Sequence, residues 1–526
     1  MYLPLPPHLR LTVAATLCTA AFGTAGACWA QTTHTADPKA DKAAPSTTAE
    51  VKSEAAQPKL QVVQVKGARS LYDPRRDDTA SKVVVNAEEI TKYGDTNVLD
   101  VLKRVPGITV DQGGSGGGQI RMRGLAGNYT QILINGERAP AGFTIDQIPP
   151  EMIEKIEVLR AASAEYSTQS IAGTINVITK QAVKLAVREL KVQLGGDRVQ
   201  FSPNANFNLS DKSGNLSWSL NGAVNRNIAD RAWPTFEDGY DAAGERILHR
   251  DMESHEHPRS LGANLAPRLS WQLDGGDTFT LQGYANTNRN ATPGHFHSHA
   301  TLGAEQAYPE VDYRNASQGN YQRADVNWVH RLESGDKLDL KFGVFGGKWD
   351  SQNGRAGAHS VPGGPLLDNY FESDSDERGL STSGKYTSSL FDGHSLVVGW
   401  NGGYSTRDDA RRELDRGVEL PHEDFDAQVT RLAVFAQDEF NLSERWSMYL
   451  GARWEGYQTE TGGTSVEEVS ARTSVLSPIF QTLYKLPDSR DQLRLALTRT
   501  YKAPPVGNLI PRRFTSTNNS QTEPDR

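Results

Sequence analysis

The sequence predicts a small α+β domain followed by an antiparallel β-barrel that crosses a membrane. Three observations carry this prediction: the chain begins with a secretory leader, its later part alternates apolar and polar residues, and short turns alternate there with long polar connections. Only 37% of the residues are hydrophobic. That value suits a barrel, because only every second residue of a barrel strand faces lipid.

The leader occupies residues 1–30. Arg10 supplies the positive charge, "LTVAATLCTAAFGTAGA" is the apolar core, and "CWA" before Gln31 is a small-residue cleavage site. Both cysteines of the chain, Cys18 and Cys28, lie in this leader, so we expect no disulfide in the mature protein. The net charge of −8 argues against a nucleic-acid partner, which requires a basic face.

A polar linker and a short β-prone run follow the leader. Residues 31–59 contain hardly any large apolar side chains and predict a disordered tether. The run "LQVVQVKG" at residues 60–67 has two interpretations. It is either the first strand of the next domain or a peptide that adds as a strand to the sheet of a partner.

Residues 68–182 mix helix and strand patterns. "GDTNVLDVLKRVPGITV" predicts a helix that ends at Pro106-Gly107. "TQILINGE" predicts a strand running into an Asn-Gly turn, and "GTINVITK" predicts another strand. "PPEMIEKIEVLR" stays ambiguous: Ile153, Ile156 and Leu159 share a helical face, whereas "IEKIEVL" also alternates as a strand.

Residues 183–526 alternate with period two, as in "LSWSLNGAVN" and "KLDLKFGVF". Tight turns such as "DKSG", "DGGD" and "ESGD" alternate with long polar segments, the arrangement of transmembrane barrels. We expect those segments to be extracellular loops; they are residues 228–258, 291–318, 350–378 and 408–426.

Five stretches carry a resemblance: "VLDVLKRVPGITV", "IRMRG", "QILINGERAP", "IDQIPPEMIEKIEVLRAASAEY" and "AGTINVITK". In content and order they resemble the plug domain of TonB-dependent outer-membrane receptors, which implies a plug at residues 68–182 and a barrel from residue 183 onward. The resemblance implies a receptor in the outer-membrane lipid of a Gram-negative bacterium that transports and does not catalyse. Its cargo is a scarce nutrient, most often a ferric siderophore or other metal chelate, and no cofactor is implied.

The resemblance also implies roles for individual residues. The run at 60–67 becomes the TonB box, which pairs with the TonB energy transducer through Val62, Val63 and Val65. Two arginines of the plug are expected to lock onto two carboxylates that point inward if Val434 and Leu450 face lipid. These four residues are Arg123, Arg160, Glu439 and Glu455.

The glycine run in "DQGGSGGGQIRMRG" is not a phosphate loop, because no Lys-Ser/Thr follows and a strand stands where a helix should begin. The resemblance places it at the plug tip that faces the ligand, and we expect ligand contacts from the polar side chains nearby. These are Gln112, Ser115, Gln119 and, from the next loop, Arg138.

Histidines in "HFHSH" suggest an alternative cargo. His295, His297 and His299 lie on one side of an extended segment and suit a transition metal or metal chelate. A further alternative follows from the strand count, which is about 13 against ~22 in outer-membrane transporters with a plugged lumen. That shortfall predicts a truncated, transport-incompetent binding protein or remnant, because an open barrel leaves unpaired strand edges in lipid. No motif organises the scattered carboxylates into a catalytic pair, so we expect no enzyme.

Overall fold

The computed structural model describes residues 79, 82–93, 98–111, 119–125, 129–138, 150, 153–180, 186–389, 393–464, 466–489 and 491–502. Described residues up to 180 form the small domain, and those from 186 onward form the large sheet. The elements of the small domain are β1 (Lys82–Asn86), α2 (Ala87–Thr91), α3 (Val98–Lys103), β2 (Ile108–Asp111), β3 (Gln119–Met122), β4 (Thr130–Ile134), β5 (Glu137–Arg138), β6 (Ile153–Leu159) and β7 (Gly173–Thr179).

The small domain is built on a five-stranded sheet in the order β1-β6-β7-β4-β5, in which only β4 and β7 run parallel. The helices bury Ile90, Val98 and Leu102 in a core shared with Ile156 and Ile175 of the sheet. None of the described helices is long and apolar enough to cross a membrane.

The structure confirms the helix and the Asn-Gly turn that the sequence predicts in the small domain. The predicted helix is α3, which ends before Gly107 at φ +85°. The turn between β4 and β5 has positive φ at both Asn135 and Gly136, as a type I′ hairpin requires. The ambiguous segment "IEKIEVL" is strand β6, paired on both sides with β1 and β7.

The large sheet has 16 described strands, and 13 of them follow one another in the path β23-β22-β21-β20-β18-β17-β16-β15-β14-β13-β10-β9-β8. The predicted number of about 13 is therefore confirmed. The bounds are β8 (Val187–Gly196), β9 (Gln200–Ser213), β10 (Leu216–Ala229), β11 (Arg231–Tyr240), β12 (Arg246–Glu256), β13 (Arg259–Gln272), β14 (Thr278–Leu302), β15 (Glu310–Arg331), β16 (Lys337–Ala358), β17 (Leu367–Ser388), β18 (His394–Asp415), β19 (Val418–Glu419), β20 (Glu423–Ser443), β21 (Trp446–Gly463), β22 (Val466–Lys485) and β23 (Gln492–Thr498).

One face of the large sheet carries a band of exposed apolar side chains. Trp400, Val434, Trp454 and Leu476 pair in register across β18, β20, β21 and β22, and they are 37%, 48%, 37% and 55% exposed. We call this the outer face, and the opposite face the inner face. A continuous apolar band on strands is the surface that a membrane barrel presents to lipid.

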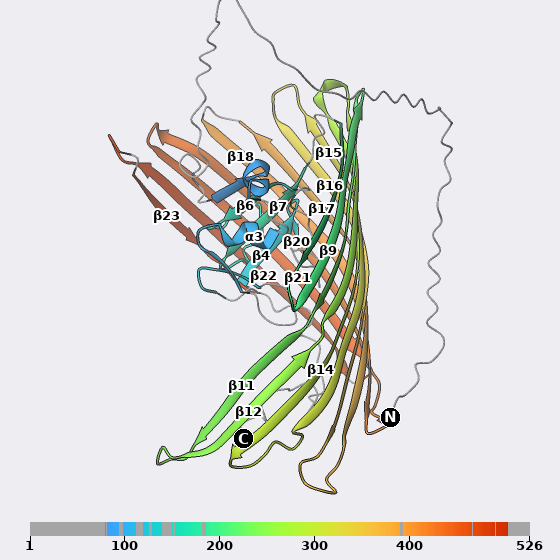
Figure 1. Ribbon diagram of the computed structural model, residues 1–526. Helices are drawn as coiled ribbons and strands as arrows, with labels where there is room; N and C mark the ends of the chain where they lie inside the picture. The colour runs from blue at the N-terminus through green and yellow to red at the C-terminus, as the bar shows by residue number, and fades with distance from the viewer. Residues whose placement is uncertain are drawn as a thin grey trace, which may run out of the picture. The chain divides into compact units, whose positions relative to one another are not determined.

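The four segments predicted as extracellular loops are not loops over most of their length, because most of their residues continue the strands. Strands β15 to β18 have 22 residues each, or ~70 Å at ~3.3 Å per residue, whereas a lipid-facing band is ~25 Å tall. The strands therefore extend far beyond the apolar band, and β16 joins β17 only through residues 359–366. The hairpin β11–β12 projects in the same way, paired to β14 (Figure 1).

Among the described strands, no pairing joins β8 to β23, so the sheet has two edges. The small domain lies against the inner face, beside β20, β21 and β22 (Figure 1).

Candidate functional site: where the small domain meets the sheet

Ten consecutive residues of the small domain make most of the hydrogen bonds that join this domain to the large sheet. This contact segment, "AASAEYSTQS" at residues 161–170, connects β6 to β7. Ala164 and Thr168 within it are fully buried, although the segment has no helix or strand of its own. Its conformation is therefore fixed by what it touches on the inner face.

A buried ion pair lies under the contact segment. Arg453 and Glu455 both project from β21 to the inner face, their side chains are 4% and 3% exposed, and Arg453 Nε lies 3.0 Å from Glu455 Oε1. Arg453 Nη1 also donates to the carbonyl oxygen of Ala164 at 3.1 Å and to Asn401 Oδ1 at 2.9 Å. One guanidinium thus joins the small domain to two strands of the sheet.

The second oxygen of the Glu455 carboxylate accepts hydrogen bonds from three hydroxyl groups. Glu455 Oε2 accepts hydrogen bonds from Ser167 Oγ at 3.1 Å, Thr168 Oγ1 at 3.4 Å and Tyr501 Oη at 2.8 Å. Thr168 Oγ1 is also 2.8 Å from Ser477 Oγ of β22. Such hydrogen bonds to a charged acceptor are stronger than those between neutral groups.

Further contacts hold the ends of the contact segment. Lys385 Nζ of β17 lies 2.6 Å from Glu165 Oε1, with both side chains about 30% exposed. The hydroxyl of Tyr449 accepts from the amide of Ala164 at 2.9 Å. Gln481 Nε2 donates to the carbonyl oxygen of Ala162 at 2.7 Å.

A separate contact lies at the start of the small domain. The amide of Thr79 donates to Glu439 Oε1 at 3.1 Å, and its hydroxyl donates to Ser447 Oγ at 2.9 Å. Arg494 Nη1 donates to the carbonyl oxygen of Thr79 at 3.0 Å. The domain is thus held at two places on the inner face.

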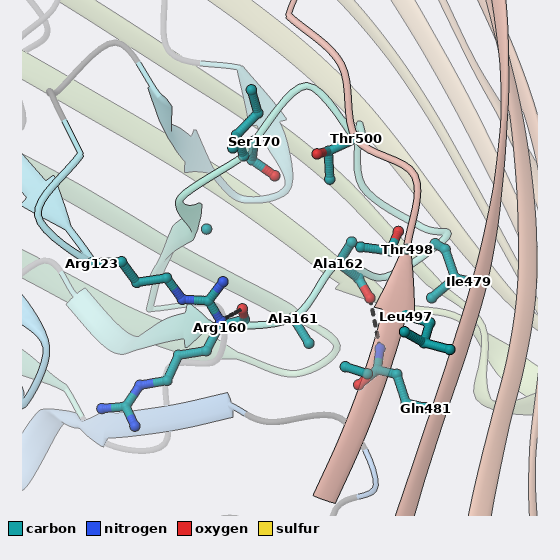
Figure 2. Close-up of a pocket in the computed structure, with 13 residues that line it drawn as sticks. Arg123, Arg160, Ala161, Ala162, Ser170, Ile479, Gln481, Leu497, Thr498 and Thr500 are labelled. Atoms are coloured by element: carbon teal, nitrogen blue, oxygen red, sulfur yellow. Dashed lines mark hydrogen bonds between the residues drawn. The ribbon is translucent and has the colours of Figure 1, made fainter.

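The two arginines expected to form the lock turn instead to their own domain. Arg123 donates to the carbonyl oxygen of Arg160, and Arg160 donates to that of Pro106. Both line a cavity of about 130 Å³ next to β22 and β23 (Figure 2). The structure does not bring them to Glu439 or Glu455, whose oxygens already accept from the amide of Thr79 and from hydroxyl groups.

The remaining predicted ligand and partner residues are mostly outside the described residues; these are Val62, Val63, Val65, Gln112 and Ser115. Gln119 opens β3 opposite Asp111, and Arg138 is in β5 opposite Leu133.

The three predicted metal ligands lie on the outer face of β14, the same side as the exposed Leu281. His295 bonds to Asp312 at 2.9 Å and to Glu310 at 2.8 Å, and His297 bonds to Glu310 at 2.6 Å. The hydrogen bond to Asp312 raises the pKa of His295. Within the described part of the chain, no three histidine, cysteine or carboxylate side chains are arranged to hold a metal ion. Each of the three rings lies near a carboxylate, and His299 Nδ1 is 3.9 Å from Glu305 Oε2. A metal site at His295, His297 and His299 stays a prediction.

One sequence pattern marks charged residues of the inner face, including two at the contact. Within the described strands, four arginines are followed two residues later by a carboxylate of the same strand, a spacing that puts both on one face. All four pairs lie on the inner face, with N–O distances of 2.6, 3.0, 3.1 and 3.0 Å: Arg323–Asp325, Arg407–Asp409, Arg411–Glu413 and Arg453–Glu455.

Two family models match this chain. The TonB-dependent receptor plug domain matches residues 74–174, and the TonB-dependent receptor-like β-barrel matches residues 193–525, more than half of the chain.

Curated relatives match over shorter stretches. The vitamin B12 transporter BtuB of Vibrio vulnificus is 38% identical over 118 residues, which are 21% of this chain and 20% of that protein. The iron-regulated outer membrane virulence protein of Vibrio cholerae is 32% identical over 216 residues, 38% of this chain and 30% of that protein. The chain thus spans less than a third of the length of either relative.

Solved structures show the same fold. The siderophore receptor PiuA of Acinetobacter baumannii has a TM-score of 0.54 at 16% identity, over 78% of this chain and 63% of that one. The ferripyoverdine receptor of Pseudomonas aeruginosa has a TM-score of 0.55 at 14% identity, over 82% and 58%. Together with the sheet and the inner-face contacts, these matches identify the chain as a member of the TonB-dependent receptors, the plugged β-barrel proteins of the Gram-negative outer membrane.

Proposed function

We propose that this chain serves TonB-dependent uptake of a scarce nutrient, with a ferric siderophore as the first candidate. Its relatives are described as siderophore, iron-regulated and vitamin B12 proteins. In this proposal Val62, Val63 and Val65 pair with TonB, and the ligand meets Gln112, Ser115, Gln119 and Arg138 from outside.

The observation that supports the proposal most is the buried Arg453–Glu455 pair under the contact segment. Transport needs a plug that is held firmly and released reversibly. A buried ion pair meets both needs, because breaking it costs several kcal/mol while re-forming it needs no new chemistry. The serine, threonine and tyrosine hydroxyls around Glu455 exchange readily for water, so separation leaves each group solvated. We therefore assign the releasable contact to residues 161–170 and β21.

Growth on single iron sources tests the function. Cells that lack their own receptors and express this chain should grow on at least one ferric siderophore, and growth should stop when TonB is removed. Val63→Pro should stop it too, because proline cannot donate to a strand ladder. Val51→Pro, the same change in the tether, is the matched control and should grow normally.

The other candidate is a binding protein without transport. It predicts that the purified chain binds a siderophore while growth never depends on TonB or on Val63. That pair of results would overturn the uptake proposal.

A further inference from the structure

A second cavity lies between the small domain and the inner face, lined in part by Asn401, which accepts a hydrogen bond from Arg453. Its volume is about 210 Å³, roughly seven times the ~30 Å³ that one water occupies in the liquid. The Asn135–Gly136 turn and Glu165 line it from the small domain, and β13 to β18 line it from the sheet. It is large enough for one small solute with part of its hydration shell.

The charged side chains around this cavity are mostly basic. Four cations and two carboxylates line it, a balance of +2 (4 − 2); they are Arg268, Lys337, Lys341, Lys385, Asp339 and Glu165. Lys337 Nζ lies 3.6 Å from Asp339 Oδ2, and Lys385 Nζ lies 2.6 Å from Glu165 Oε1. These two pairs account for both lining carboxylates.

The other two cations also donate hydrogen bonds. Arg268 Nη1 donates to Gln282 Oε1 at 2.8 Å, and Lys341 Nζ donates to the carbonyl oxygen of Asn135 at 3.3 Å. Glu154 of the small domain acts on Arg268 through space. The buried Nε of Arg268 has no hydrogen-bond partner among the described groups. A buried donor on a charged group is costly to leave unsatisfied, and an oxyanion is the ligand that a guanidinium binds best.

We propose that this cavity is a binding site for a small oxyanion, a phosphate or carboxylate group held by Arg268 and Lys341. Thr280 and Ser383, which also line the cavity, supply hydroxyl donors to its remaining oxygens. Two sources provide this chemistry: free inorganic phosphate, and a carboxylate carried by a larger solute. The inference goes beyond the proposed uptake and does not depend on it.

Isothermal titration calorimetry on the full chain in detergent tests the proposal, with inorganic phosphate and acetate titrated separately at constant ionic strength. We expect saturable binding of at least one anion. Arg268→Gln should weaken it tenfold or more, because a charge-assisted hydrogen bond is worth ~1.5–3 kcal/mol and ~1.4 kcal/mol is tenfold. Lys341→Gln should weaken it severalfold. Phosphate binding without acetate binding identifies free phosphate, and acetate binding identifies a carboxylate group.

Lys348→Gln is the matched control. Lys348 is on the same strand as Lys341, but it lies on the outer face near Asp376, 3.2 Å away, so binding should not change. Circular dichroism confirms that each variant retains its strands. The proposal fails if neither anion binds at millimolar concentration, or if binding survives unchanged in both Arg268→Gln and Lys341→Gln.

Discussion

Replacing Glu455 by glutamine should release the contact segment from the sheet. The change keeps the size of the side chain and one carbonyl oxygen that can accept from Ser167, Thr168 and Tyr501. It removes the negative charge that lies 3.0 Å from the Nε of Arg453, and the Arg453 side chain is only 4% exposed. Removing one partner of a buried pair costs ~3–5 kcal/mol, because the other charge stays buried without compensation. Even 3 kcal/mol corresponds to a shift of about 100-fold in the docking equilibrium.

Hydrogen exchange measured by mass spectrometry reads this equilibrium directly. The amide of Ala164 is bonded to Tyr449 at 2.9 Å, so it exchanges only when the contact segment separates from the sheet. Where opening and closing are fast, the exchange rate tracks the free energy of opening. We expect peptides covering residues 161–170 to exchange about 100-fold faster or more in Glu455→Gln.

Two controls make the result decisive. Glu460→Gln alters the same strand on the outer face, where Glu460 accepts from Gln458 at 2.6 Å, and exchange of the contact segment should stay unchanged. Combining Glu455→Gln with Arg453→Met removes both charges and should recover part of the protection. The reasoning is refuted if Glu455→Gln changes exchange less than threefold, or if the double variant is more open than the single one.

Three other variants test separate parts of the structure. Lys385→Gln should speed exchange of the contact segment only two- to fivefold, because its ion pair with Glu165 is about 30% exposed and such pairs contribute ~0.2–1 kcal/mol. The hydrogen bond to Asp312 raises the pKa of His295. This bond therefore stabilises the pairing of β14 with β15 around these two residues, and it does so fully at pH values below the ordinary histidine pKa of ~6.5. The stabilisation is lost as pH rises through the raised pKa. Exchange there, corrected for its intrinsic pH dependence, should quicken between pH 6 and 8.5, and His295→Asn should abolish the change. Gly173→Ala should lower the thermal midpoint of the small domain, since φ is +145° and the added methyl group would lie 2.7 Å from a carbonyl oxygen of β6.

The sequence predicted the strands that face an apolar environment and missed those that face water. Phe342 and Val344 of β16 alternate with polar residues and are exposed on the outer face at 50% and 47%, so their period is visible. Beyond them Lys348 and Asp350 continue the same strand on the same face. With water on that side, both faces are polar, and the period-two signal disappears although the backbone ladder continues. Residues 350–378 therefore had the composition of a loop.

The contact residues were harder to predict than the fold because the partners lie far apart in the sequence. Ser167 and Glu455 are separated by 288 positions, and no local pattern says which strand meets which turn. The sequence did show that Glu455 alternates with Leu450, which is 44% exposed on the outer face. It did not show that hydroxyl groups, rather than Arg123 or Arg160, would reach the carboxylate.

The four Arg-x-acid pairs share one sequence pattern and one face of the sheet, but three of them are partly exposed and one is buried. Each pair keeps the inner face nearly neutral, and each arginine is held at 2.6–3.1 Å by a carboxylate of its own strand. Only Arg453 also donates to the contact segment, because β21 is where the small domain lies against the sheet. In the other three pairs the side chains are 7–25% exposed, against 3–4% for Arg453 and Glu455. The same ion pair is thus partly solvated on most of the inner face and desolvated beneath residues 161–170. Burial by the small domain removes this pair from water and brings Arg453 within hydrogen-bond distance of Ala164.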